Sequence, residues 1–510
     1  MCTRASVKFP PYRPRLARTG AWRPLFWLRF FPTISAVPAV SAAEHICASV
    51  AELHAAFKTA RLGDVFLMRD GTWEDADIVL EATGQPDQPI TLRAATPGQV
   101  VLTGRSRVRL AGQWIVVDGL RFERCRGMAL TDIVEFRTGS SRKQGYATHS
   151  RLTNCAFVDC SPPDNKTNTR YVSLFGSDNR VDHCYLAGKT NLGPSLVVWL
   201  EAGPVRHRID HNHFGPRPEL GFNGGETIRV GDSVTSQINA RCVIESNLFT
   251  GCDGEVEIIS NKSCENIYRH NTFRECAGTL TLRHGHRNLV DGNFFFGEHK
   301  PMSGGVRIIN RDQTVVNNYF VDLEGEGPFA ALCLMNGIPD SPAAGYDQVM
   351  RARVAFNTVV NCRQSFVIGY KSPTRAEPIL SPRDCTFANN LVVSRSGPLV
   401  RVTTAPTGSA WLGNLLHGAE PGVPDSVGVT VSDPMLVVAP DGVWRPGPAS
   451  PARGASAGGF EFVSTDIDGQ PRPAKSDVGC DQHSSAPVVH HPLTASDVGP
   501  SWRKSAGADR

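Results

Sequence analysis

Short stretches in which apolar residues alternate with polar ones recur along the middle of the chain. Examples are "LTNCAFV", "IDHNHFG", "IESNLFT", "YRHNTFR" and "FANNLVV". Alternation with a period of two, bounded by turn-forming residues, is typical of short β-strands. Helical spacing of apolar residues is clear only in 49–64, where we predict a short helix that caps the first coil of a repeat.

The recurring stretches align on one column of residues, separated by 22 to 39 positions: Cys155, Cys184, Asn212, Asn247, Asn271, Asn293, Asn318, Asn357 and Asn390. Amides stacked in successive coils can hydrogen-bond one another, and Asn also tolerates left-handed turn geometry. We therefore predict an all-β chain with a single domain, a right-handed parallel β-helix (a solenoid). An antiparallel β-propeller is the alternative, although its blades would show steadier spacing.

The chain divides into three parts by composition. Residues 1–43 hold seven Lys and Arg and no acidic residue, and they include "PLFWLRFFPTISAVPAVSAA". This pattern predicts an export signal and a secreted or periplasmic protein, with an unstructured basic leader as the alternative. Residues 44–483 form the predicted β-helix, with its last coils and closure from about 400, and residues 484–510 form a tail that is disordered or lies on the surface. No later segment has the roughly 18 apolar residues of a membrane span.

Charge and cysteine usage narrow the function classes. The net charge of +4 comes from the basic leader, so the remainder is slightly acidic and does not indicate a nucleic-acid-binding surface. The 14 cysteines are scattered without a CxxC pair. They are better explained as small buried residues than as zinc ligands or a disulfide framework.

Candidate chemistry begins in "GEVEIISNKS", residues 254–263. Glu255 and Glu257 would share one face of a strand and repel each other. With an amide oxygen from Asn223, about one coil earlier, they would offer the oxygen ligands that Ca²⁺ prefers. A solvated pair of glutamates is the plainer alternative.

Basic residues follow in the same region. Lys262 has the opposite strand parity to Glu257, so the chain must turn at Ser260 and Asn261 if both act at one site. A neutral Lys262 could act as a base, and a charged one would only neutralise the glutamates.

Arg283 follows Lys262 by 21 residues, about one coil, so we expect it directly above or below. With His284, His286 and Arg307 it would form a cationic strip that binds anions, or else a solubilising edge.

The motifs "NGGETIR", "DGEVEIISNKS", "LTLRHG" and "GGVRI", in this order, resemble polysaccharide lyase family six, the family of chondroitinase B and alginate lyases. The resemblance extends from "GDVFLMRDGTWEDADI" to "DVGPSW". It implies a right-handed parallel β-helix. It also implies the following roles: calcium ligands Asn223, Glu255 and Glu257, catalytic base Lys262, catalytic acid Arg283, and substrate contacts His284, Arg307 and Lys189.

The expected function is a calcium-dependent lyase that cleaves an anionic uronic-acid polysaccharide by β-elimination. We favour alginate, because an unsulfated uronan needs only the residues already found. The alternatives are a chondroitinase B-type lyase acting on dermatan sulfate and a noncatalytic carbohydrate-binding β-helix. A metal-free hydrolase with paired carboxylates is disfavoured by the accompanying Lys262 and Arg283. Inserts at 160–170 and 335–350 are candidate walls of the substrate groove.

Overall fold

The computed structural model describes residues 42–126, 132–139, 145–371, 379–423 and 428–504. The chain divides into Met1–Ser41 and Ala42–Arg510, and the second unit contains all of the described residues. The predicted export signal therefore lies outside the described residues, apart from its last two positions. No helix in the described ranges is long and apolar enough to cross a membrane.

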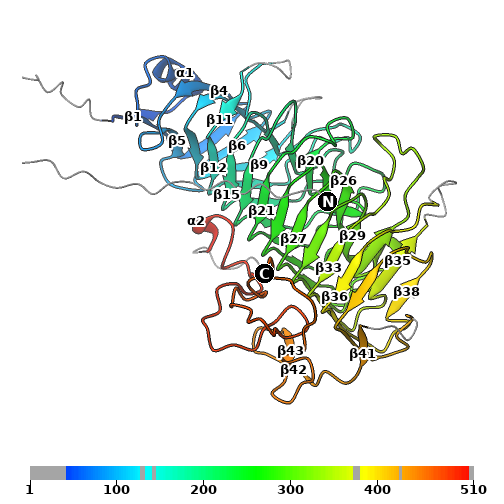
Figure 1. Cartoon of the computed structure of the whole chain (residues 1–510). Helices are drawn as coiled ribbons and strands as arrows, with labels where there is room; N and C mark the ends of the chain where they lie inside the picture. The colour runs from blue at the N-terminus through cyan, green and yellow to red at the C-terminus, as the bar shows by residue number, and fades with distance from the viewer. Residues whose placement is uncertain (1–41, 127–131, 140–144, 372–378, 424–427, 505–510) are drawn as a thin grey trace, which may run out of the picture. The chain divides into compact units, whose positions relative to one another are not determined.

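Three parallel sheets make up almost all of the described secondary structure (Figure 1). Two have 14 strands and one has 13, and they run from β1 (Glu44–Cys47) to β39 (Ala410–Leu412), from β3 (Gly71–Glu74) to β41 (Val429–Val431) and from β11 (Ala147–Thr148) to β38 (Val400–Val402). Through most of the chain, neighbours within a sheet are three strands apart in sequence, so the chain visits each sheet once per coil. The predicted parallel β-helix is confirmed, and the propeller alternative is wrong.

A short helix precedes the second coil. Helix α1 (Val50–Phe57) begins after Ser49, whose side chain accepts a hydrogen bond from the Glu52 amide at 3.2 Å. Its apolar residues Leu53 and Phe57 are buried against the first coils. The helix is shorter than the predicted 49–64, because the chain turns after Phe57 and reaches a left-handed glycine, Gly63.

The column of asparagines forms a continuous ladder inside the solenoid. The side-chain oxygen of Asn293 accepts from both the backbone and the side-chain nitrogen of Asn271, at 3.0 and 2.9 Å. The same paired bonds recur from Asn212 to Asn414, which lies one coil beyond the predicted column. Each buried amide is therefore satisfied by the next coil.

The left-handed bend beside this ladder falls one residue earlier than expected. His211, Ser246 and His270 have φ values of 53°, 53° and 54°, whereas the asparagines that follow them do not adopt positive φ. Asparagine is thus selected here for its amide hydrogen bonds, and the explanation from turn geometry is wrong for these positions.

An aromatic stack runs beside the ladder, two residues further along each strand. The rings of Phe249, Phe273 and Phe295 stack with centroids 4.5 Å apart, and Phe214 and Phe320 extend the stack at 4.8 Å. The 13 described cysteines are all unpaired and buried, as predicted for small core residues.

Residues 484–504, here called the C-terminal strap, lie back along the β-helix and end in α2 (Ser501–Lys504). The strap backbone donates from Leu493 to the Thr272 hydroxyl and from Gly499 to the His211 carbonyl, both at 2.8 Å. Trp502 donates its indole N–H to the Asn154 carbonyl at 2.8 Å. The strap thus joins coils that are far apart in the sequence.

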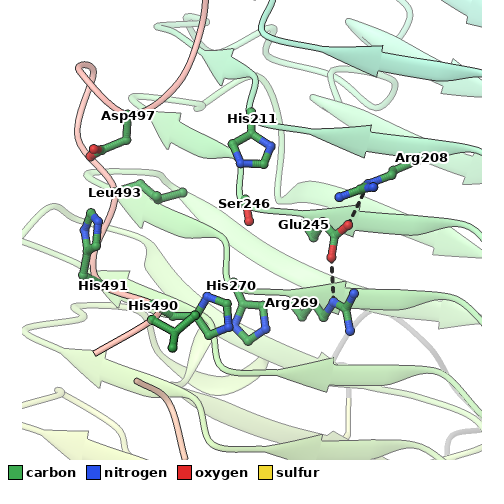
Figure 2. Close-up of a pocket in the computed structure, with 11 residues that line it drawn as sticks. Arg208, His211, Glu245, Ser246, Arg269, His270, His490, His491, Leu493 and Asp497 are labelled. Atoms are coloured by element: carbon green, nitrogen blue, oxygen red, sulfur yellow. Dashed lines mark hydrogen bonds and ion pairs between the residues drawn. The ribbon is translucent and has the colours of Figure 1, made fainter. Parts of the chain in front are cut away.

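A pocket lies where the strap meets the solenoid (Figure 2). The His490 ring of the strap stacks on His270 with centroids 3.6 Å apart. On the pocket floor, Arg208 and Arg269 both pair with Glu245, at 2.8 and 2.6 Å. The charges of this pocket are therefore largely satisfied within the protein.

The asparagine ladder makes a prediction about stability. Asn293→Ala removes the acceptor of two buried donors of Asn271, and each unsatisfied buried donor costs about 1–3 kcal/mol. We expect the free energy of unfolding to fall by about 2–4 kcal/mol, measured by denaturant titration. The exposed Asn165→Ala is the matched control and should change stability by less than about 0.5 kcal/mol. Equal stability of the two variants would show that the ladder does not stabilise the fold.

Candidate active site

Four adjacent strands of the 13-stranded sheet carry the predicted chemistry: β20 (Ile228–Gly231), β23 (Glu257–Lys262), β26 (Gly278–His284) and β29 (Ser303–Ile308). The register pairs Ser260 with Thr281 and Thr281 with Arg307. Residues two apart along each strand share a face, and paired residues of successive coils stack on that face. Side chains that are 20 to 50 residues apart in sequence are thereby brought together.

The pairing of β23 with β26 contains a bulge at the predicted catalytic residues. Asn261 pairs with Leu282 and Lys262 pairs with His284, so Arg283 is left as an extra residue. The expectation that Arg283 lies directly above or below Lys262 is therefore wrong, because His284 takes that register. The bulge gives Arg283 a direction that regular pairing would not allow.

Strand β23 contains no turn at the position predicted from the sequence. It continues through Ser260 and Asn261 to Lys262, and two register shifts replace the turn. These shifts change which residues face the groove while keeping the strand hydrogen-bonded. The predicted turn at Ser260 and Asn261 is wrong.

Glu257 is the point at which three side chains meet. Its carboxylate accepts hydrogen bonds from the Ser260 hydroxyl and from the Arg307 guanidinium. The Arg283 Nε lies 3.7 Å from the same carboxylate. Glu257 and Arg307 are both buried, so this is a largely desolvated ion pair with a second arginine beside it.

Glu255 lies just before β23 rather than on it. Its carboxylate accepts from the backbone amides of Gly224 and Gly225, at 2.7 and 3.3 Å. Burial, and after it the negative charges of Glu226 and Glu257, raises the pKa of Glu255 to about 7. The repulsion predicted for this region is present, although the two glutamates do not share a strand face.

Asn223 and Glu255 line one cavity of about 780 Å³. Phe222 and Met302 supply apolar surface to the same cavity, and Lys300 supplies a cation. Lys300 is already paired with Asp253 at 2.5 Å. Two of the three predicted calcium ligands therefore face one cavity, and the third, Glu257, is held by Arg307.

Lys262 stands beside a carboxylate that the sequence reasoning missed. The Lys262 Nζ lies 3.9 Å from Oε1 of Glu226, whose side chain is buried. Glu226 lies three residues after Asn223 in "NGGETIR", so its position in a quoted motif was the available signal. The neighbouring His284 Nε2 lies 3.3 Å from the Ser233 hydroxyl.

A loop from a later coil holds Arg283 from the other side. The Arg283 guanidinium lies 4.3 Å from the centroid of the Tyr346 ring. It donates to the carbonyls of Gly345 and Ala344, at 2.9 and 3.1 Å. This loop belongs to the insert at 335–350, and Tyr346 was not identified from the sequence.

Lys189 does not present its ammonium group to solvent. The residue is 1% exposed, and its Nζ donates to both oxygens of Asn191, at 2.9 and 2.6 Å, and to the Leu192 carbonyl at 3.3 Å. Burial lowers the pKa of Lys189 well below its ordinary value, with a contribution from the nearby Arg217. The predicted contact of Lys189 with substrate therefore has no support in this structure.

The donor set of the site fits a hard cation. Carboxylate and amide oxygens are the ligands of Ca²⁺, and Glu226 keeps a buried oxygen, Oε2, without a hydrogen-bond partner. No ion pair of Glu255 occurs in the described part of the chain. The three glutamates do not form a closed cage. Over the described ranges, the one group of three or more His, Cys, Asp or Glu whose ligand atoms all lie within 4.8 Å of one another is Asp466, Asp468 and Asp481 of the C-terminal closure. There Arg445 pairs with Asp468 and Asp481.

Comparisons with a family model and with solved structures relate this chain to known polysaccharide lyases. A family model described as Chondroitinase B matches residues 47–418. A solved structure of a PL6 family alginate lyase, AlyGC, is 34% identical with a TM-score of 0.79, and the match covers 90% of this chain and 59% of that chain. A search of curated protein sequences gave no match.

Two further solved structures are similar. A mannuronic acid specific family 6 lyase from human gut microbiota is 32% identical, with a TM-score of 0.67 and coverage of 76% of this chain and 91% of that one. The PL6 family lyase Pedsa3628 from Pseudopedobacter saltans is 24% identical, with a TM-score of 0.68 and coverage of 90% and 99%, and it supports the fold alone. The chain spans about 59% of the length of the AlyGC structure. Together, the family model and these relatives show that this chain belongs to polysaccharide lyase family six.

Proposed function

We propose that the protein is a calcium-dependent lyase that cleaves alginate by β-elimination. The observation that carries this proposal is the placing of cations at buried carboxylates on adjacent strands of a family-six chain: Arg283 and Arg307 lie at Glu257, and Lys262 lies beside Glu226. A base, a cationic group for the leaving oxygen and an anion-binding arginine are the groups that such an elimination requires.

Asn223, Glu255 and Glu257 would hold the calcium ion. When bound, Ca²⁺ would neutralise the uronate carboxylate and so make the adjacent C5 hydrogen more acidic. Glu257 already accepts a hydrogen bond from Arg307. Its carboxylate would therefore bind both the arginine and the calcium ion.

Lys262 is the proposed base. Its side chain is partly exposed, so the amine can reach a sugar bound over the sheet. In its neutral form it takes the C5 proton.

Arg283 faces the leaving C4 oxygen in this proposal. As the C5 proton leaves, the C4–C5 double bond forms and the bond from C4 to the oxygen breaks. A guanidinium stays charged, so Arg283 donates hydrogen bonds to this oxygen as negative charge develops there, and the released oxygen takes its proton from solvent water. Its contacts with Tyr346 and the Gly345 carbonyl fix its direction before substrate binds.

The cavity beside the site supports an unsulfated substrate. Glu219, Asp253 and Glu255 line it, and the single described cation there, Lys300, is paired with Asp253. A sulfate group would find no free cationic donor among the described residues of this cavity, whereas a uronate carboxylate can bind calcium and the arginines. One relative described as an alginate lyase and another described as mannuronic acid specific support the same choice. A polymeric substrate outside the cell also fits the export that residues 1–43 predict.

The first test measures the ultraviolet absorbance of the unsaturated uronate formed by elimination. The protein is mixed separately with polymannuronate, polyguluronate and dermatan sulfate, with calcium or with a chelator. We expect absorbance to rise on one of the two alginate blocks and only with calcium. Lys262→Ala should lower turnover by about 10²- to 10⁴-fold, as expected for loss of a general base.

Lys475→Ala, an exposed lysine of the C-terminal closure, is the matched control and should keep wild-type turnover. A rise on dermatan sulfate alone would contradict the substrate. Activity that persists in the chelator would contradict the role of calcium. Full activity of Lys262→Ala would remove the lysine from the mechanism.

A second test concerns the loop that holds Arg283. Tyr346→Ala removes the ring beneath the guanidinium, and a displaced catalytic group costs rate more than binding. We expect kcat on the cleaved polymer to fall about tenfold or more, with little change in KM. Tyr346→Phe keeps the ring and should retain most of the activity. Equal losses in both variants would show that the hydroxyl, rather than the stacked ring, matters.

A further inference from the structure

Glu226 has a buried carboxylate, one oxygen of which accepts no hydrogen bond. The residue is 2% exposed, and its Oε2 has no hydrogen-bond partner. Its other oxygen lies 3.9 Å from the Lys262 Nζ, which is beyond hydrogen-bond distance. A buried, partly unsatisfied carboxylate is costly, so a chain that keeps one has a use for it.

The backbone around Glu226 is fixed. Its carbonyl accepts from the Ser195 amide at 3.2 Å and from the Arg217 guanidinium at 2.6 Å. The next residue, Thr227, donates to the Ile258 carbonyl at 3.0 Å, which joins this segment to β23. The carboxylate therefore cannot swing away to solvent by a simple loop movement.

Two glycines bring this segment close to the turn that carries Glu255. A Cβ on Gly225 would lie 2.2 Å from the Gly254 carbonyl oxygen, and a Cβ on Gly254 would lie 2.2 Å from the Gly225 oxygen. Only glycine at both positions permits this approach. The approach sets the carboxylates of Glu226 and Glu255 on neighbouring turns.

The turn that leads into Glu226 holds the Glu255 carboxylate. Glu255 accepts from the amides of Gly224 and Gly225, the residues just before Glu226. Asn223 begins the same turn and lines the cavity with Glu255.

We propose that Glu226 is an additional oxygen ligand of the cation site, beside Asn223 and Glu255. This inference rests on the calcium site of the proposed function and adds to it a residue that the family resemblance did not supply. The competing role for Glu226 is a purely structural ion pair with Lys262. The two roles differ in the expected response to calcium alone, without any polysaccharide.

The test is a calorimetric titration of calcium chloride into the full chain after treatment with a chelator. We expect the wild type to bind calcium and Glu226→Gln to bind it at least about tenfold more weakly. Glu81→Gln, an exposed glutamate of the described chain, is the matched control and should keep wild-type affinity. Lys262→Ala should bind calcium at least as tightly as the wild type, because it removes only a nearby positive charge.

Thermal unfolding supplies a second readout. Without calcium, Glu226→Gln should melt at or above the wild-type temperature, since it removes a buried charge with an unsatisfied oxygen. With saturating calcium the order should reverse, because the wild type gains more from the ion. A structural role would instead lower the melting temperature in both conditions.

Wild-type calcium affinity in Glu226→Gln would overturn this inference and leave the proposed function intact. Failure of the wild type to bind calcium would overturn both the inference and the role of calcium in the proposed function. The elimination chemistry would then be judged by the absorbance assay alone.

Discussion

Hydrogen bonding in register between successive coils is the constraint on which the rest of this structure depends. Each strand has only three to seven residues in most coils, so a coil is stable only against its neighbours. The asparagine ladder fixes that register from inside, because an amide displaced by one position would lose its acceptors. Because the register is fixed from inside, the outer face can carry polar groups whose burial costs free energy.

The site uses this rigidity where it departs from regular pairing. Both register shifts of the β23–β26 pair lie within the stretch from Glu257 to Lys262. Flanking strands remain hydrogen-bonded on either side, so the shifts redirect side chains without loosening the sheet. Arg283 gains its direction from the bulge, and the loop at Tyr346 fixes it.

The fold could be predicted from the sequence because its signal is repeated. Nine aligned positions identified the ladder, whereas the aromatic stack beside it was recognised only in the structure. The bulge at Arg283 could not be predicted, since a shift of one residue depends on packing across strands rather than on local pattern. The motifs predicted which residues form most of the site. The pairing of Glu257 with Arg307 and the burial of Glu226 could not be predicted, because they depend on contacts between different coils. The enclosure of the Lys189 ammonium group could not be predicted, because a lysine in a turn gives no sign that backbone and side-chain oxygens surround it.

The distribution of charge explains where a cation is needed. Glu257 already has two arginines, and Glu226 has Lys262 nearby, whereas the hydrogen-bond partners of Glu255 among the described residues are backbone amides. The sequence suggested that a metal offsets repulsion between Glu255 and Glu257. In the proposed site, Glu226 would add to the negative charge that the ion offsets, because its turn lies against the turn of Glu255 at two glycines, Gly225 and Gly254. Glu257 would then serve both the cation site and the arginines that it already binds.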